Sequence, residues 1–425
     1  MFTFSSPSGP RPLCGLAALL GLALAAFTSQ AQSTLNFDQA LRAAQDRSHQ
    51  LVAQDAAAQA SREMAVAAGQ RPDPTLKVGI NNLPVNGADR FSLGRDFMTM
   101  RSVGLMQEIT RSDKLKARSA RYEREAEAAE AVRAVALVTL RRDTAAAWLD
   151  SHYQQQMLLL LRSQRAEASL QIDAADAAYR GAQGTQLDVF AARSAVALID
   201  DRILQAERLV STAKTQLVRW VGDAAKQPLG APPLLTAVRL EADKVESQLA
   251  QHPAIALLAR QEEIARADVD IAQGNMRADW SVELMLNQRG SAYSNMVSVN
   301  LSIPLQLDAK QRQGRELAAR LAVVEQLRAQ REEATRELVA QAQGWLQAWQ
   351  SDRSRLAHYD SALIPLAAER TRAALAAYRG GAGPLGGVLE ARRLEIDTRM
   401  DRLRLEMEAA ARWAQLQYLL LPEGE

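Results

Sequence analysis

Tyr179-Arg-Gly-Ala-Gln-Gly-Thr-Gln-Leu-Asp-Val-Phe-Ala-Ala-Arg193 is a glycine-rich stretch that lies between two long segments with the composition of helices. A second copy, Tyr378-Arg-Gly-Gly-Ala-Gly-Pro-Leu-Gly-Gly-Val-Leu-Glu-Ala-Arg392, matches it without a gap, and seven of the fifteen positions are identical. Both stretches are typical of sharp reversals between helices, because glycine adopts a positive φ at little cost. The sequence therefore predicts two helical hairpins, one in each half of the chain, with tips at 179–188 and 378–387.

The segments that flank these tips are unusually long. Thr110 to Arg180 contains neither Gly nor Pro, and as one helix it would extend about 105 Å. A return helix is predicted from Thr185 to Val221. In the second half, a long helix is expected from about Asp308 to Arg379, kinked at Pro365, with a return helix to about Leu420.

Each half also contains an earlier helix and a pair of strands. A capping box at Asn36 and Gln39 opens a helix expected to run unbroken to Ala68, and His252-Pro253 opens its counterpart. Apolar and polar residues then alternate with the period of a strand, which predicts β-hairpins at 74–109 and 278–304. The apolar positions are Leu76, Val78, Ile80, Val103, Leu105, Trp280, Val282, Leu284, Leu286, Val297, Val299, Leu301 and Ile303.

Composition limits the classes of function. The 425 residues include 51 basic and 49 acidic ones, for a formal net charge of +2. This balance argues against a nucleic-acid partner. Residues 1–31 have the basic, apolar and small-residue regions of a cleaved signal peptide. The only cysteine, Cys14, lies within that segment, so the mature chain is expected to have no disulfide and no thiolate metal site.

The order of elements predicts a duplicated, mainly helical chain. The first repeat is assigned to 32–222, a linker or equatorial region to 223–250, and the second repeat to 251–425. Four strands cannot close a barrel, and an open sheet edge in lipid leaves backbone groups without partners. Three chains would supply 12 strands, with apolar faces toward lipid and the long helices continuing as a tube. Closure by several chains would thus give a transmembrane β-barrel continued by an α-helical coiled-coil barrel.

This layout, with its Tyr-Arg-Gly tips and the Pro72-Asp-Pro74 approach to the first strand, resembles the TolC-type outer-membrane efflux family over residues 35–421. The stretch Asn82-Leu-Pro-Val-Asn-Gly87, with Asp96-Phe-Met-Thr-Met100 and Val103-Gly-Leu-Met-Gln-Glu108, is similar to the heavy-metal (cobalt–zinc–cadmium, CzcC-like) branch. The resemblance implies a homotrimeric outer-membrane exit duct, with a 12-stranded barrel and a periplasmic helical extension. Its implied partners are a periplasmic adaptor (membrane-fusion) protein and an inner-membrane pump of the RND type.

The resemblance also implies roles for the tips. The candidates for adaptor contact are Arg180, Gly181, Gly184, Arg379, Gly380 and Gly383. Glu390 would form an acidic ring at the periplasmic aperture, or would only favour the helix dipole; one turn earlier this chain has Gly387 where some relatives carry an aspartate. Asp188 and Tyr378 would form a latch between helices, or Tyr378 would simply pack beneath its turn.

Other side chains indicate little chemistry. Met98, Met100 and Met106 are soft ligands in principle but are also ordinary apolar residues. The histidines have no ligand spacing; they are His49, His152, His252 and His358. The glycine-rich run 380–387 lacks the Lys-Ser/Thr end of a phosphate loop. No cofactor, resident metal site or enzymatic activity is therefore expected.

The function expected from these observations is a passive exit duct for heavy-metal cations. The same duct could instead serve a multidrug pump or a type I secretion system. A periplasmic coiled-coil scaffold without a pore is the alternative from another class, and the four alternating strands argue against it.

Overall fold

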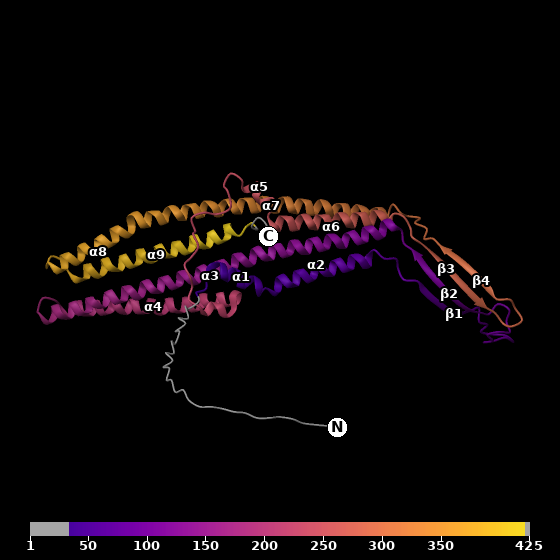
Figure 1. Cartoon of the computed structure of the whole chain (residues 1–425), viewed down its shortest axis with the longest axis horizontal. Helices are drawn as coiled ribbons and strands as arrows, with labels where there is room; N and C mark the ends of the chain where they lie inside the picture. The colour runs from indigo at the N-terminus through magenta and orange to yellow at the C-terminus, as the bar shows by residue number, and fades with distance from the viewer. Residues whose placement is uncertain (1–33, 421–425) are drawn as a thin grey trace, which may run out of the picture. The chain divides into compact units, whose positions relative to one another are not determined.

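The structure of the chain is a computed structural model that describes residues 34–420. Within these residues it contains long helices and a four-stranded sheet (Figure 1). The segment 1–31, predicted to be a signal peptide, lies outside the described residues. The α-helices are α1 (Phe37–Asp46), α2 (His49–Ala68), α3 (Ser112–Arg180), α4 (Gln186–Val221), α5 (Val245–Leu249), α6 (Pro253–Asn275), α7 (Gln313–His358), α8 (Ile364–Arg379) and α9 (Leu385–Gln417).

The sheet is antiparallel, with the strand order β1-β2-β3-β4. Its strands are β1 (Thr75–Asn81), β2 (Met100–Ile109), β3 (Trp280–Gln288) and β4 (Met296–Ser302). The register pairs Leu76 with Leu105, and Leu105 with Leu284. The predicted strands are thus confirmed, and β2–β3 pairing joins the two hairpins into one sheet.

The two faces of this sheet differ in chemistry. One face carries ten aliphatic side chains that are each more than half exposed, namely Leu76, Val78, Ile80, Val103, Leu105, Leu284, Leu286, Val297, Val299 and Leu301. We call this set the aliphatic face. The other face is polar: Lys77 pairs with Glu283 at 2.9 Å, and Asn287 donates to Ser298 at 3.0 Å. In a water-soluble protein the apolar face of an antiparallel sheet is usually buried against the core. Within residues 34–420 of this chain the apolar face is exposed instead.

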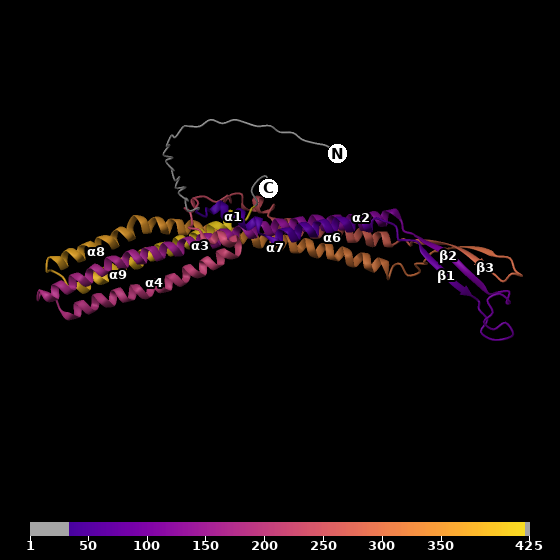
Figure 2. The ribbon, with the colours of Figure 1, turned by 60° about the horizontal axis from the view of Figure 1, so that its bottom comes forward.

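Helix α3 organises the helical part. It has 69 residues, which gives a length of about 100 Å, and it runs from the sheet to the first tip (Figures 1 and 2). Near the sheet it packs against α2 and α6, and toward the tip against α4 and α9. Buried alanines along α3 let neighbouring backbones approach closely; they are Ala126, Ala128, Ala136, Ala145, Ala168 and Ala175.

The largest core cluster lies midway along α3. Trp148 is fully buried there, and Phe37 meets it edge-on with a centroid distance of 5.5 Å. The Trp148 indole donates to the backbone carbonyl of Leu35 at 3.2 Å. Leu35 also receives a hydrogen bond from Gly230 N at 3.2 Å and donates to Pro228 O at 2.8 Å. The first described residues are therefore bonded both to α3 and to the segment between the two halves of the chain.

One expectation about helix continuity was wrong. The helix expected from Asn36 to Ala68 is divided, because Ser48 caps a new helix by accepting a hydrogen bond from Leu51 N at 3.4 Å. A serine side chain offers the backbone this alternative to continued helix. The capping box at Asn36 is present, and Gln39 accepts from the Asn36 backbone at 3.1 Å.

The second division falls where Pro365 predicted a kink. The expected helix from Asp308 begins at Gln313, and a π-helical segment, Tyr359–Leu363, separates α7 from α8. Proline has no backbone N–H, so the carbonyl four residues earlier has no helical donor, and a wider turn accommodates the mismatch. Asp360 in this segment is tied to α9 by an ion pair with Arg402 at 2.8 Å.

Candidate functional site

The two tips, tip 1 (179–188) and tip 2 (378–387), reverse the chain with the same hydrogen bonds. In tip 1, Gln183 N donates to Ala178 O at 2.9 Å and Ala182 N donates to Tyr179 O at 3.1 Å. In tip 2 the matching bonds run from Ala382 N to Ala377 O at 2.8 Å and from Gly381 N to Tyr378 O at 3.1 Å. This is the Schellman arrangement, which satisfies the last carbonyls of a helix.

The residue that takes the left-handed conformation differs between the tips. Gly381 has φ 72°, as the glycine-rich sequence led us to expect, but in tip 1 the residue with positive φ is Ala182, at 56°. Gly181 and Gly380 both have φ −81°. The expectation that a glycine supplies the positive φ was therefore wrong for tip 1. An alanine in this region is strained by its Cβ atom.

Gly184 and Gly383 are required for a different reason. A Cβ atom at Gly184 would lie 3.1 Å from the Cβ of Ala178, and one at Gly383 would lie 3.3 Å from the Cβ of Ala377. The returning chain thus passes directly against the helix that it has just left. Because neither glycine has a side chain, the two chain segments of each tip can lie this close together.

The helices that leave the tips begin differently. Thr185 caps α4, and its hydroxyl accepts from Asp188 N at 3.2 Å and donates to the Asp188 carboxylate at 2.7 Å. The Thr185 N–H also donates to that carboxylate, at 3.0 Å. These hydrogen bonds, the one from the hydroxyl first, lower the pKa of Asp188. In tip 2, Pro384 occupies the cap position without a side-chain hydrogen bond, and Gly386 and Gly387 lie in the first turn of α9.

Asp188 and Tyr378 do not form the predicted latch in this conformation. No hydrogen bond among residues 34–420 joins them, and the Asp188 carboxylate is engaged by Thr185. Tyr378 instead packs, partly buried, against the small apolar cluster formed by Ala175, Val189, Ala192, Leu385 and Val388. This packing is the alternative role of Tyr378, and the latch stays a prediction.

Glu390 lies on the first turns of α9 and is half exposed. Its carboxylate pairs with Arg393 at 3.1 Å. Both residues line a groove of about 570 Å³ between α4 and α9, with Arg202 and Arg392 also at its wall. The positive charge of Arg393 thus partly offsets the negative charge of Glu390.

Ion pairs between distant segments join the two hairpins near the tips. Arg392 of α9 pairs with Glu167 of α3, and Arg202 of α4 pairs with Asp397 of α9 at 2.6 Å. No sequence signal identifies these pairs, because their members are far apart in the chain and arginines are frequent on every helix.

The arginines at the tip ends are accessible. The side chain of Arg180 is 77% exposed and its guanidinium lies 3.6 Å from Asp176. Arg379 is also exposed. Of the two tyrosines, Tyr179 is 48% exposed, whereas its counterpart Tyr378 is partly buried.

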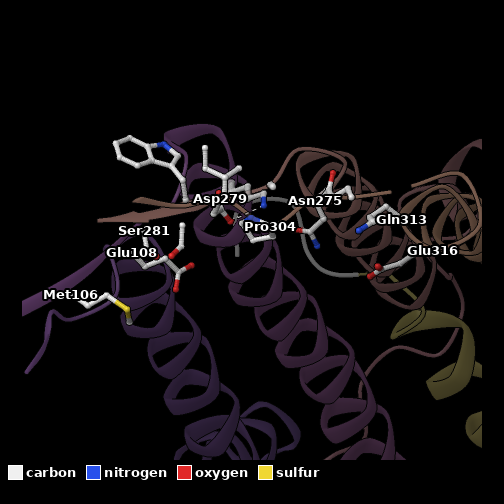
Figure 3. A pocket seen from close by; sticks show the side chains of 14 residues that line it. Met106, Glu108, Asn275, Asp279, Ser281, Pro304, Gln313 and Glu316 are labelled. Atoms are coloured by element: carbon white, nitrogen blue, oxygen red, sulfur yellow. Dashed lines mark hydrogen bonds and ion pairs between the residues drawn. The ribbon is translucent and has the colours of Figure 1, made fainter. Parts of the chain in front are cut away.

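A second hollow, of about 760 Å³, lies where the sheet meets the helices (Figure 3). Its wall contains the buried Lys114, which pairs with Asp279 at 2.7 Å; Asp279 also accepts from the Arg111 backbone at 3.2 Å. Met106 lines this hollow as well. Asp279 therefore fixes the start of α3 against the start of β3.

Residues 34–420 contain neither a candidate membrane-spanning helix nor a cluster of metal-binding side chains. None of the helices there combines the length and apolar character that a membrane span requires. No cluster of three or more histidine, cysteine, aspartate or glutamate side chains in this range is arranged to bind a metal ion. His252, one of the scattered histidines, caps α6 by accepting from Ala254 N at 3.1 Å.

Comparison with known proteins identifies the fold. No family model and no curated protein sequence matches the chain. Solved structures do match: the outer membrane protein VceC from Vibrio cholerae has a TM-score of 0.75 and 17% identity, covering 90% of this chain and 95% of that one. CusC has a TM-score of 0.74 and 16% identity, covering 97% and 98%. The CmeC outer membrane channel of Campylobacter jejuni has a TM-score of 0.74 and 11% identity, covering 97% and 94%. The chain thus has, over nearly its whole length, the fold of these outer-membrane channels.

Proposed function

We propose that the protein is the outer-membrane channel of a tripartite efflux system. The observation that carries this proposal is the aliphatic face of the sheet. Ten aliphatic side chains, more than half exposed, are together a patch that a soluble protein does not leave in contact with water. The shared fold with VceC, CusC and CmeC supports the same conclusion.

The assembly that follows is a homotrimer. Strands β1 and β4 are the edges of the sheet in one chain, and edges exposed to lipid are costly. Three copies, joined edge to edge, make a 12-stranded barrel whose polar face, including Lys77 and Glu283, lines a water-filled lumen. The helices then continue the lumen on the periplasmic side. In this assembly, residues 32–222 and 251–425 are the two repeats of each chain, and residues 223–250 are the linker between them. Residues 1–31 are the signal peptide, which directs export and is then cleaved.

The tips are the proposed contact with the periplasmic adaptor, which connects the duct to an inner-membrane RND-type pump. Arg180 and Arg379 are exposed at the ends of the helices. The neighbouring glycines, Gly181, Gly184, Gly380 and Gly383, allow an adaptor helix to approach the backbone. Glu390, Asp188 and Tyr378 remain the proposed gate residues, with the latch as a state that this conformation does not contain.

Heavy-metal cations are the proposed cargo, on the resemblance of the 82–108 segment to the heavy-metal branch. The duct itself is passive, and selectivity belongs to the pump and the adaptor. The same duct can serve a multidrug or type I system, and the experiment below separates these outcomes.

A strain that lacks the gene, with and without complementation, should be grown on graded zinc, cobalt, cadmium, nickel, copper and silver beside dyes and antibiotics. Sensitivity to metals alone, restored by complementation, supports the proposed cargo. Sensitivity to drugs alone contradicts the cargo and leaves the channel. The channel is tested separately by adding the purified protein to a planar lipid bilayer; failure to produce stepwise conductance would contradict it.

A further inference from the structure

Arg101 lies at one end of the aliphatic face and has an unusual environment. In the register of the sheet it is opposite Ile80 on β1 and Gln288 on β3. Its side chain is therefore on the same face as Val103, two residues along β2. Arg101 is exposed, and within residues 34–420 its side chain makes no hydrogen bond or ion pair.

Three other cations, on the polar face of the sheet and at its opposite end, form ion pairs. Lys77 pairs with Glu283 at 2.9 Å on the polar face. At the opposite end of the sheet, Arg111 pairs with Asp113 at 2.8 Å and the buried Lys114 pairs with Asp279 at 2.7 Å. That end of the aliphatic face carries Trp280, which is 40% exposed. The aliphatic face is therefore asymmetric, with a free guanidinium at one end and an indole at the other.

The surface around Arg101 is hollowed. A depression of about 750 Å³ is lined by Val78, Ile80, Val103 and Leu286 along the strands, and by Arg101, Gln288 and Asn295 toward the loops. Its apolar part fits an acyl chain, and its polar end offers one cation and two side-chain amides. A guanidinium binds phosphate oxygens with two parallel hydrogen bonds, and it does so most strongly where water is partly excluded.

From this charge complementarity we infer that the depression binds a phospholipid with an anionic phosphate headgroup, seated on Arg101 with an acyl chain along Val78, Val103 and Leu286. The inference rests on the proposed function, because the aliphatic face must be in a membrane. It adds that the channel recognises one headgroup chemistry at the loop end of its sheet.

The test uses the purified full chain in a non-ionic detergent and a fluorescent phospholipid as the bound probe. Phosphatidic acid, phosphatidylcholine with the same acyl chains, and inorganic phosphate are compared as competitors. Phosphatidic acid should displace the probe about fivefold more effectively than phosphatidylcholine. Inorganic phosphate at the same concentration should displace little, because it has no acyl chain. Equal displacement by inorganic phosphate would assign the site to free phosphate and overturn the inference.

Variants of Arg101 itself and of its neighbour Gln288 test the role of the guanidinium. R101Q should abolish the preference for phosphatidic acid, and R101K should keep most of it. Q288E puts a carboxylate directly opposite Arg101 across the β2–β3 pair, so it should also abolish the preference while leaving Arg101 in place. Q288E remains informative if R101Q does not fold. A preference that survives both changes would overturn the inference.

Arg95 provides the matched control. It lies in the loop between β1 and β2, where it pairs with Asp89 at 3.7 Å. Arg95 is not part of the proposed lipid site. R95Q should therefore leave the preference for phosphatidic acid unchanged. A loss equal to that of R101Q would mean that the preference depends on the total charge of the loops, and would contradict a site at Arg101. If the wild-type protein does not insert into vesicles, the proposed function fails. If it inserts and conducts without headgroup preference, only this inference fails.

Discussion

Tip 1 and tip 2 close their hairpins with the same two backbone hydrogen bonds, but only tip 1 has a side-chain cap on the helix that follows. In tip 1 the strained left-handed residue is Ala182, and the hydrogen bonds between Thr185 and Asp188 stabilise the start of the next helix. Tip 2 relieves the strain with Gly381 but begins α9 with Pro384 and two glycines. The helices that lead into the tips differ in the same way: α8 buries only Thr371 among the described residues, whereas the matching last stretch of α3, residues 165–180, buries Ala168, Gln171 and Ala175. The second hairpin is thus the less firmly anchored of two reversals with one geometry.

The largest change in this comparison is expected from G381V. Gly381 has φ 72°, and a β-branched side chain there should destabilise tip 2 by about 2 kcal/mol. Hydrogen exchange of the tip 2 amides in the purified protein would measure the local free energy of opening. G387A is the matched control, because a Cβ atom at that position meets open space. Equal exchange in the two variants would contradict the role of the left-handed residue.

The cap of tip 1 is the next test. T185A removes the hydroxyl that bonds both the backbone and the carboxylate of Asp188, and should cost about 1 kcal/mol of local stability. Exchange should accelerate in the first turn of α4 and stay unchanged at tip 2. Acceleration of both tips to the same degree would indicate a global effect and would remove the distinction between them.

Transferring the cap should make the tips alike. The double variant P384T/G387D gives α9 the threonine and the aspartate that begin α4. We expect tip 2 to gain a little less than 1 kcal/mol, since Pro384 already restricts the unfolded chain. Slower exchange in the first turn of α9 is the expected result. No change would mean that side-chain capping is not what separates the tips.

The smallest predicted effect is a difference in pH dependence. Because the pKa of Asp188 is lowered in the folded chain, its contribution is fully present above the unfolded value, about 3.9, and is lost as the pH falls through the folded value. Protection factors at tip 1 should therefore decline in that acid range, and those at tip 2, whose cap does not titrate, should not. D188N should remove the difference; a decline that persists in D188N would assign the effect to another group.

The sequence predicted the features that local patterns determine. Alternation located all four strands, and the absence of Gly and Pro from Thr110 to Arg180 predicted α3 to within a few residues. The break at Ser48 was missed because a serine within a helical pattern is compatible with both a cap and a surface position. Ala182 was missed because the neighbouring glycines are the residues that usually take a positive φ.

The site was predicted less completely than the fold. The pairing of Glu390 with Arg393 follows helical spacing and could have been expected. The pairing of Arg392 with Glu167 depends on how α9 packs on α3, which no local pattern determines. The positions of the two reversals could be predicted because the chain contains the stretch twice. The contacts that the tips make with other proteins depend on surfaces that a single chain does not contain.

The bonds around Leu35 have a consequence for the order in which the chain folds. Leu35 takes its place only after Trp148, Pro228 and Gly230 are available, and a ribosome makes those residues much later than Leu35. The backbone of Leu35 therefore stays without these partners until more than half of the 425 residues have been synthesised. Contacts between residues so distant in sequence form slowly because a long loop must close. The hydrogen bonds of Leu35 therefore form late, and they require that the first half of the chain and the segment after it are both present.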